Sequence, residues 1–520
     1  MRTHFRGEQL ADPAVKECEK NLRACVHCGI CTATCPTYVL LGDERDSPRG
    51  RIVMMQKMLE EEGAPSTETV THLDRCLSCL ACRTACPSGV DYARLIDRSR
   101  AHIERHYRRP LGDRILRWTI ATVLTRPSLT RIALAFARLA FPFTYFLPHR
   151  LRAMAEKARP HWFLPREAGE GDHASEARGS VFAQHGGGGG SSRPPRRLRR
   201  HSPRKRGESQ IFETSPQGGA LRRVALLPGC VQQVIAPEID EAVGRLLARR
   251  GIELVPLPRA GCCGALPHHL GRESEAKAWA RKMIEAFERA GGAEAFESVL
   301  ISATGCAAHI HELEYLFADE PDWQARARAF SSALVQLEGL SSPVYGGGGS
   351  PQSGEPEGGF AAAPPSASLT LFARHLPRKR GRISTEARTT GLSELRVALH
   401  VPCSQQHGLH WPDSTQLLEE ADFKVLQIPE GHLCCGSAGS YSLLQPEIAN
   451  ELRKRKLANI RALRPDVIAT SNIGCLQHLS GPDAPPIVHI AELLDWAEGG
   501  PVPPALHNRV QLMAAGEPVD

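Results

Sequence analysis

The sequence predicts a multidomain α+β protein, in which a mainly helical, cysteine-rich domain is followed by a duplicated α/β domain with parallel sheets. Three observations predict this. Nine of the 17 cysteines lie in the first 100 residues, in two copies of one closely spaced pattern. The other eight lie in two later stretches that alternate strand-like and helix-like segments, and the two sets of cysteines are in register. A chain of 520 residues is long enough for several hydrophobic cores.

Residues 1–100 contain the most specific signal, a cysteine pattern with spacings of two, two and three residues that ends in proline and occurs twice. Bacterial two-cluster ferredoxins use this spacing, and the fourth cysteine of each run there binds the other cluster. We therefore predict a helical ferredoxin-type domain with two [4Fe-4S] clusters. The ligands of the first are Cys25, Cys28, Cys31 and Cys86, and those of the second are Cys76, Cys79, Cys82 and Cys35.

Two structural zinc sites are the alternative for these eight cysteines, since zinc also binds four thiolates at similar spacings. Forty residues separate Cys35 from Cys76, including an expected helix at 47–62 that Gly63 and Pro65 end. This long connection favours a mainly helical module of the kind that transfers electrons within larger dehydrogenases. Cys18 lies outside both patterns and is expected in a helix without a ligand role.

Residues 101–170 follow as a helical connector, rich in Arg, Leu, Ile and Phe at roughly helical spacing. Its basic side is either solvated or docks on a partner or an anionic membrane surface. The longest apolar run, 132–148, is interrupted by Arg138 and Pro142 and is shorter than the roughly 18 residues that a membrane span needs. We expect a soluble or peripherally attached protein.

Two stretches, within the intervals 171–220 and 341–394, are expected to be disordered because their Gly, Ser, Pro and Arg content cannot bury enough apolar surface. Both contain a poly-glycine run and the sequence Pro-Arg-Lys-Arg-Gly. The basic segments 186–208 and 346–384 carry net charges of +7 and +3, so the rest of the chain carries −3 although the total is +7. The apparent basicity therefore belongs to these segments, and we expect no nucleic-acid partner. A basic nucleic-acid-binding protein with zinc sites remains the alternative from another class.

Residues 221–340 and 395–500 repeat each other, and a tail follows at 501–520. In each repeat three expected strands end just before a cysteine group, and corresponding cysteines are offset by 173, 172 and 169 residues. The expected strands are 224–227, 252–257 and 298–302 in the first repeat, and 397–401, 423–428 and 466–470 in the second. Open parallel sheets place their binding crevice at the carboxyl ends of the strands, where these cysteines are expected.

We call these stretches the CCG repeats, after the Cys-Cys-Gly turn that each contains. A turn of this kind places two sulfurs side by side, and its glycine permits close approach of the backbone. The candidate ligands are Cys230, Cys262, Cys263, Cys306 and His309 in the first repeat, and Cys403, Cys434, Cys435, Cys475 and His478 in the second. They could hold a further cluster or metal or form a redox thiol site; buried structural cysteines are the alternative.

Several signals are missing from the sequence. Residues 1–20 lack the apolar stretch of a secretion signal, so we expect a cytoplasmic location with reduced thiols, where clustered cysteines more often bind metals or catalyse than form disulfides. No glycine-rich dinucleotide loop follows a strand, and there is no P-loop, zinc-protease motif or nucleophile elbow. We therefore expect no flavin or nicotinamide site on this chain.

The motif order resembles the iron-sulfur subunits of bacterial 2-hydroxy-acid and glycerol-3-phosphate dehydrogenases and of heterodisulfide reductases. The strings at 47–51, 72–79, 86–90, 262–271 and 471–475 are similar to those of the glycolate oxidase iron-sulfur subunit family. This resemblance implies a complex for glyoxylate metabolism, in which FAD-binding subunits oxidise glycolate to glyoxylate. The present chain would pass the electrons on to a quinone or another acceptor. Together with the basic helical connector, this leaves open a peripheral contact at the inner face of the cytoplasmic membrane.

The runner-up keeps the electron-transfer role and changes the donor to lactate, glycerol 3-phosphate or a thiol/disulfide couple. One departure from the heterodisulfide reductases concerns the CCG repeats. There the domain ends in Cys-x-x-Cys and supplies five thiolates, whereas here both repeats end in Cys-x-x-His. His309 and His478 could replace cysteine on iron, as in Rieske centres, or serve a quinone or a subunit contact.

Overall fold

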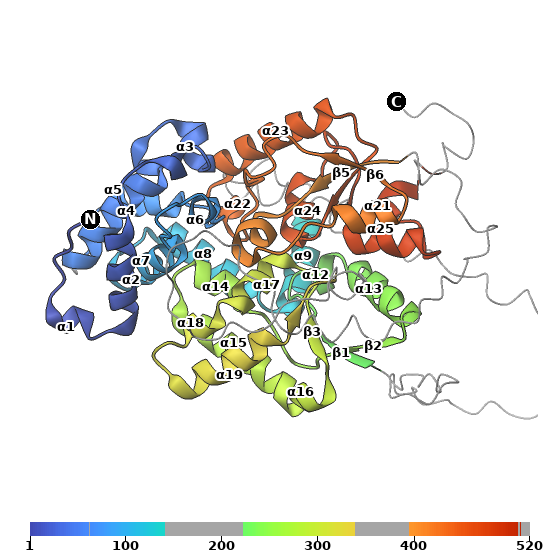
Figure 1. Cartoon of the computed structure of the whole chain (residues 1–520), viewed down its shortest axis with the longest axis horizontal. Helices are drawn as coiled ribbons and strands as arrows, with labels where there is room; N and C mark the ends of the chain where they lie inside the picture. Colours follow the sequence, from blue (N-terminus) through green and yellow to red (C-terminus); the bar gives the residue numbers. More distant parts are fainter. Residues whose placement is uncertain (62, 141–221, 338–394, 508–509, 511–520) are drawn as a thin grey trace, which may run out of the picture. The chain divides into compact units, whose positions relative to one another are not determined.

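The computed structural model describes residues 1–61, 63–140, 222–337, 395–507 and 510 (Figure 1). The segments expected to be disordered at 171–220 and 341–394, and most of the 501–520 tail, lie outside the described residues. All described residues belong to one compact unit.

The first 106 residues are helical and contain no strand among those described. The helices are α1 (Gly7–Leu10), α2 (Pro13–Ala24), α3 (Pro36–Leu41), α4 (Pro48–Glu61), α5 (Thr67–Asp74), α6 (Ala81–Thr84) and α7 (Tyr92–His106), with 3-10 turns η1 (Ile30–Thr32) and η2 (Glu44–Asp46). The helix expected at 47–62 is α4. Ser47 caps it, because its hydroxyl accepts a hydrogen bond from Gly50 N at 2.9 Å while Pro48 takes the first helical position.

Cys18 lies in α2 and is 1% exposed, as expected of a helix residue. Its thiol donates to the carbonyl of Arg94 in α7 at 3.5 Å. This contact gives the thiol a structural partner away from both cysteine loops.

Two further helices, α8 (Leu111–Val123) and α9 (Pro127–Ala140), lie in the interval where a helical connector is expected. One side of α8 packs inward through Ile120 and Ala121, which are 1% exposed. Large apolar side chains of both helices are exposed on another side: Leu111, Ile115, Trp118, Ile132 and Phe136. Among the described helices, none combines the length and the hydropathy of a membrane span.

The first CCG repeat is a four-stranded parallel sheet of order β2-β1-β3-β4. Its strands are β1 (Arg222–Leu226), β2 (Ile252–Pro256), β3 (Ser298–Leu300) and β4 (Leu334–Val335). Its helices are α12 (Gln232–Ile235), α13 (Glu238–Arg249), α14 (Ala265–His269), α15 (Glu273–Arg289), α16 (Gly292–Ala295), α17 (Thr304–His311), α18 (Leu313–Leu316) and α19 (Pro321–Ser332).

The second CCG repeat has the same topology, with order β6-β5-β7-β8 and all neighbours parallel. Its strands are β5 (Arg396–His400), β6 (Lys424–Gln427), β7 (Val467–Thr470) and β8 (Ile487–His489). Its helices are the π-helix η8 (Ser404–Leu409), α21 (Thr415–Glu420), α22 (Tyr441–Leu444), α23 (Pro446–Ala462), α24 (Ile473–Leu479) and α25 (Ile490–Ala497), and the 3-10 turn η9 (Pro504–Leu506) follows. The predicted fold class is confirmed; each sheet has a fourth strand that the sequence did not predict.

The two repeats share a hydrophobic core built from β1, α13, β5, β7 and α25. Asp495 of α25 is 1% exposed and accepts hydrogen bonds from Arg245 and Arg249 of α13, at 2.8 and 2.7 Å. His489 at the end of β8 donates from Nε2 to the Ser302 carbonyl, just after β3, at 3.0 Å. The His489–Ser302 hydrogen bond holds the carboxyl ends of β8 and β3 together, and the Asp495 ion pairs join α25 to α13.

The helical N-terminal part contacts both repeats. Arg83 donates to Glu312 of the first repeat at 3.2 Å, and Arg94 also pairs with Glu312. The Tyr441 hydroxyl of the second repeat donates to the Arg75 carbonyl at 3.0 Å. The cysteine loops of the N-terminal part therefore lie next to the cysteine ends of the repeats.

Candidate metal centres

The eight cysteines of the N-terminal part surround two separate cavities. Cys25, Cys28, Cys31 and Cys86 line the first, and Cys35, Cys76 and Cys79 line the second. Cys82 borders both. The structure therefore brings together the two sets of four thiols that the sequence pairs, including the crossover of Cys35 and Cys86; that they bind metal stays a prediction.

Both cysteine loops contain two residues with left-handed backbone conformation at corresponding positions. His27 and Gly29 have φ values of 57° and 81°, and the corresponding Ser78 and Leu80 have 52° and 60°. Non-glycine residues rarely adopt this conformation, and it is typical of functional sites where the surrounding structure enforces it. These turns curl each loop so that its cysteines point to one cavity, and Ser78 N donates to Cys76 Sγ at 3.5 Å.

The two sites differ in exposure. Cys28 of the first site is exposed, and the large apolar side chains of Val26 and Ile30 beside it are 68% and 53% exposed. In the second site Cys35 and Cys76 are both 7% exposed. The first site is therefore accessible from the protein surface, and the second site is more deeply buried.

A buried cation faces the second site. Arg51 is 1% exposed, and its NH1 lies 3.8 Å from Cys35 Sγ. It pairs with the fully buried Asp46 at 3.2 Å and donates from Nε to the His72 carbonyl at 2.8 Å. Arg75 also pairs with Asp46, at 2.9 Å, so two cations surround one carboxylate. The resulting net positive charge suits a group of thiolates.

The chemistry of both donor sets fits an iron-sulfur cluster. Burial raises the pKa of Cys31 to about 11 and the pKa values of Cys79 and Cys82 well above the ordinary thiol value. Four such sulfurs become thiolates together only when bound metal compensates their charge. Soft thiolate-only sets of this kind select iron-sulfur clusters or zinc.

The cysteines of the first CCG repeat meet beyond the ends of β1, β2 and β3. Cys230, Cys262 and Cys263 are 6%, 1% and 7% exposed. His309 in α17 is 6% exposed, burial lowers its pKa to about 3, and its Nε2 has no hydrogen-bond partner among the described residues. A neutral imidazole nitrogen of this kind can bind a metal or accept a proton.

In the second CCG repeat, Cys403 Sγ and Cys434 Sγ are 3.8 Å apart. The ligand atoms of His400, Cys435 and Cys475 lie within 4.8 Å of one another, and all three residues are buried. His478 Nε2 instead donates to the Ala449 carbonyl at 3.1 Å. The structure thus places a histidine, His400, in the sulfur group that sequence reasoning missed.

The only sequence signal for His400 is its position at the end of a strand, three residues before Cys403. The corresponding residue of the first repeat is Leu227, so the repeat pattern offered no support. The second CCG site therefore contains an imidazole where the first contains an alkyl side chain.

In each repeat, hydrogen bonds among the thiols favour one thiolate. They lower the pKa values of Cys263 and Cys435 well below the ordinary value and raise those of Cys262 and Cys434. The adjacent glycines have φ values of 93° at Gly264 and 96° at Gly436. A side chain there would meet a backbone carbonyl and the histidine of the Cys-x-x-His pair.

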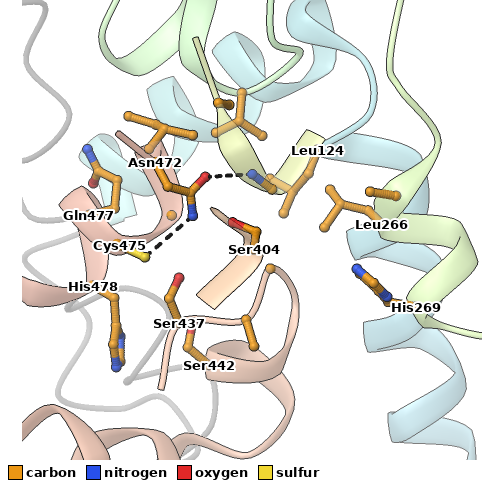
Figure 2. A pocket seen from close by; sticks show the side chains of 18 of the residues that line it. Leu124, Leu266, His269, Ser404, Ser437, Ser442, Asn472, Cys475, Gln477 and His478 are labelled. Carbon is orange, nitrogen blue, oxygen red and sulfur yellow. Dashed lines mark hydrogen bonds between the residues drawn. The ribbon is translucent and has the colours of Figure 1, made fainter. Parts of the chain in front are cut away.

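The second thiol site of the N-terminal part adjoins the second CCG site. Cys79, Cys403 and Cys434 pack in one hydrophobic cluster with Leu77 and Tyr441. Cys79, but neither Cys28 nor Cys31, also borders a large cavity that reaches the sulfur groups of both CCG repeats. Figure 2 shows this cavity, with Ser404, Ser437 and Cys475 across from Leu124 and Leu266.

The two CCG sites are hydrogen-bonded to each other at this cavity. Asn472 accepts a hydrogen bond from Gly305 N at 3.3 Å and donates to Cys475 Sγ at 3.4 Å (Figure 2). Ser404 donates to Thr304 Oγ1 at 2.9 Å. Asn472 thus connects the first turn of α17, which carries Cys306, with the sulfur of Cys475.

Family models match both cysteine regions. The 4Fe-4S dicluster domain matches residues 21–90, and the cysteine-rich domain CCG matches residues 224–311 and 397–480. These matches confirm the iron-sulfur character of the chain and its two CCG repeats. Three predictions stay untested: the number of clusters, the individual ligands, and the absence of flavin.

Curated relatives match along much of the chain. The glycolate oxidase iron-sulfur subunit of Escherichia coli strain K12 is 32% identical over 96% of this chain and 99% of its own length. The probable glycolate oxidase iron-sulfur subunit of Bacillus subtilis strain 168 is 27% identical over 92% of this chain and 95% of its own. Lactate utilization protein A of Halalkalibacterium halodurans is 26% identical over 53% of this chain and 98% of its own. Because the first of these matches spans nearly the whole of both sequences, the chain belongs to the family of glycolate oxidase iron-sulfur subunits.

Proposed function

We propose that this chain is the electron-transfer subunit of a glycolate dehydrogenase complex. FAD-binding partner subunits oxidise glycolate to glyoxylate, and this chain carries the electrons to a quinone. The observation that carries the proposal is the succession of sulfur sites. One four-thiol site is at the surface, and a second is buried and packed against the second CCG site.

Two [4Fe-4S] clusters supply one-electron redox chemistry when bound. Cys25, Cys28, Cys31 and Cys86 would hold the first, and Cys35, Cys76, Cys79 and Cys82 would hold the second. Because Cys28 is exposed, electrons enter at the first site. Val26 and Ile30 provide an apolar surface beside it for the donor subunit. Arg51 stabilises the additional negative charge that arrives at the second site.

Electrons leave the second site toward the CCG repeats, because Cys79 packs with Cys403 and Cys434. A further cluster or metal in the second repeat would be held by Cys403, Cys434, Cys435, Cys475 and His400. The corresponding set in the first repeat is Cys230, Cys262, Cys263, Cys306 and His309. Each set therefore contains four thiols and one neutral imidazole, and the two histidines come from different positions of the repeat.

We further propose a cytoplasmic location with peripheral contact at the inner face of the membrane. The exposed apolar side chains of α8 and α9 support this proposal. Arg114 and Arg131 are exposed beside them, which suits an anionic lipid surface. A quinone in the membrane would then approach the protein from the side of α8 and α9.

The test is to purify the chain with its FAD-binding partners and to measure iron, acid-labile sulfide and glycolate-dependent reduction of a dye and a quinone. We expect about eight irons for two cubane clusters, their EPR signals on reduction, and loss of acceptor reduction when this chain is omitted. Zinc without iron, or acceptor reduction unchanged by its omission, would contradict the proposal.

A second candidate donor is lactate, since lactate utilization protein A matches about half of this chain. A panel of 2-hydroxy acids and glycerol 3-phosphate offered to the same complex separates these donors. The glycolate reading predicts the highest kcat/KM with glycolate.

A further inference from the structure

The cavity between the CCG repeats has a volume of about 920 Å³, within the range of small-molecule binding sites. Its lining comes from three parts of the chain. The N-terminal part contributes Cys79, the repeats contribute both Cys-Cys pairs, and α8 and α9 contribute an aliphatic wall. That wall contains Ile120, Val123, Leu124, Leu134 and Ala137.

The charges on the lining exclude an anionic ligand. The one Lys or Arg among the described lining residues is Arg453. Its guanidinium already pairs with Asp483 at 2.7 Å and donates to the His478 carbonyl at 2.7 Å. Asp97 and Glu312 also line the cavity, and Glu312 already pairs with Arg83 and Arg94. A carboxylate such as glycolate would therefore lose its hydration without gaining a cation, whereas a neutral apolar molecule would not.

A few polar groups converge within this apolar lining. His269 Nδ1 is buried and has no hydrogen-bond partner among the described residues. Figure 2 shows its ring directed into the cavity, below Leu266 and Leu124. Ser437 and Gln477 lie on the opposite side. An apolar body with carbonyl oxygens at its ends matches this pattern of aliphatic walls and isolated donors.

We propose that this cavity binds a lipophilic quinone as the electron acceptor, with its ring between the two CCG sites and its tail along α8 and α9. The proposal rests on the electron-transfer function above. Two electrons arrive singly through the sulfur sites and reduce the quinone, and two protons from water complete the quinol. The His269 imidazole donates a hydrogen bond to one carbonyl oxygen and so positions the ring.

The first test is photoaffinity labelling of the full iron-loaded chain with an azido derivative of a short-chain quinone, followed by peptide mapping. We expect the label on peptides of α8 and α14 and its displacement by unlabelled quinone. Leu124→Trp fills the cavity and should abolish that labelling. Ala248→Trp, on an exposed position of α13, should leave it intact. Label on other peptides, or label insensitive to Leu124→Trp, would overturn the proposal.

The second test uses the complex with its FAD-binding partners. Leu124→Trp should lower kcat/KM for the quinone by about tenfold or more while reduction of a hydrophilic dye, which takes electrons at the exposed first site, stays within about twofold. His269→Phe should raise the KM for quinone, and His269→Gln, which keeps a donor, should restore part of it. Unchanged quinone kinetics in both Leu124→Trp and His269→Phe would overturn the assignment. Loss of both dye and quinone reduction in the wild-type complex would instead contradict the proposed function, and the labelling would still decide the cavity.

Discussion

Arg51 provides the clearest test of how a single residue tunes a cluster. Its guanidinium lies 3.8 Å from Cys35 Sγ in a fully buried position. Since a nearby cation stabilises the more negative reduced state, Arg51→Gln should lower the reduction potential of the buried cluster on the order of 60 mV, a tenfold change for one electron. EPR-monitored redox titration measures this.

Arg75→Gln is the matched control, because Arg75 pairs with the same Asp46, whereas the arginine that lies against Cys35 Sγ is Arg51. The Arg75→Gln variant should lower the stability of the protein without lowering the reduction potential of the buried cluster by the same amount. If Arg51→Gln fails to bind the cluster, Arg51→Lys is used in its place, because lysine keeps the positive charge. Equal potentials in all three variants and the wild type would contradict this role.

His489 makes stability depend on pH. Burial lowers the pKa of His489 to about 4, whereas histidine in an unfolded chain has a pKa near 6.5. Below pH 6.5 the unfolded chain therefore binds the proton that the folded chain refuses. The contribution of neutral His489 to the free energy of unfolding is fully present above pH 6.5. It is lost as the pH falls toward 4, which lowers that free energy by about 3 kcal/mol.

His489→Gln should remove this part of the pH dependence. The measurement is the difference in apparent Tm between wild type and variant from pH 7.5 to 5, which cancels the shared contributions of His269 and His309. We expect the wild type to lose stability faster as the pH falls. Parallel curves would show that His489 does not titrate in this way.

At the scale of the element, the Cys-Cys-Gly turn is constrained by close approach as well as by backbone angle. A Cβ at Gly436 would lie 2.5 Å from the Ala449 carbonyl and 3.0 Å from His478 Nε2. Gly499 has a similar φ of 90° but has nothing within 4 Å of such a Cβ. Gly436→Ala should therefore destabilise the protein by about 1–3 kcal/mol more than Gly499→Ala.

Chemical denaturation and metal analysis of both glycine variants give the comparison. If the turn holds metal, Gly436→Ala should also lower metal content in the second repeat, and Gly499→Ala should not. Equal stabilities would show that the close contact relaxes without cost.

Variants on the exposed face of α8 test the proposed contact with the membrane. Leu111, Ile115 and Trp118 recur at helical spacing on one exposed face of α8, and Arg114 lies among them. The double change Ile115→Glu and Trp118→Glu should reduce co-sedimentation with phosphatidylglycerol-containing vesicles by about tenfold or more, since each side chain loses its apolar burial. Leu41→Glu, at an exposed apolar residue of α3, is the control and should bind as wild type.

At the scale of the whole molecule, cysteine spacing predicted the module order and the pairing of thiols into two groups, and the alternation of strand-like and helix-like segments predicted the parallel strands. It could do so because ligands fall at fixed intervals and each repeat reproduces the other. The packing of Cys79 and Cys403 against one hydrophobic cluster could not be predicted, because it joins separate modules. Arg51 carried no motif, His400 had only a leucine at the corresponding position, and the cavity wall formed by α8 and α9 depends on long-range packing.

The last prediction concerns the basic segment 346–384, which lies outside the described residues. Leu337 and Leu395, the described residues on either side of it, pack in the same hydrophobic cluster. Both ends of the connection are therefore anchored in the core that the two repeats share, and shortening a long connection changes the closure entropy only slightly. Deletion of 346–384 should retain iron content and glycolate-dependent activity, and should lower the net charge by 3. Replacement by an uncharged Gly/Ser segment of the same length separates charge from length. If the deletion and the Gly/Ser replacement both lose activity and also lose nucleic-acid binding, the segment binds nucleic acid and is not merely a connection between the repeats.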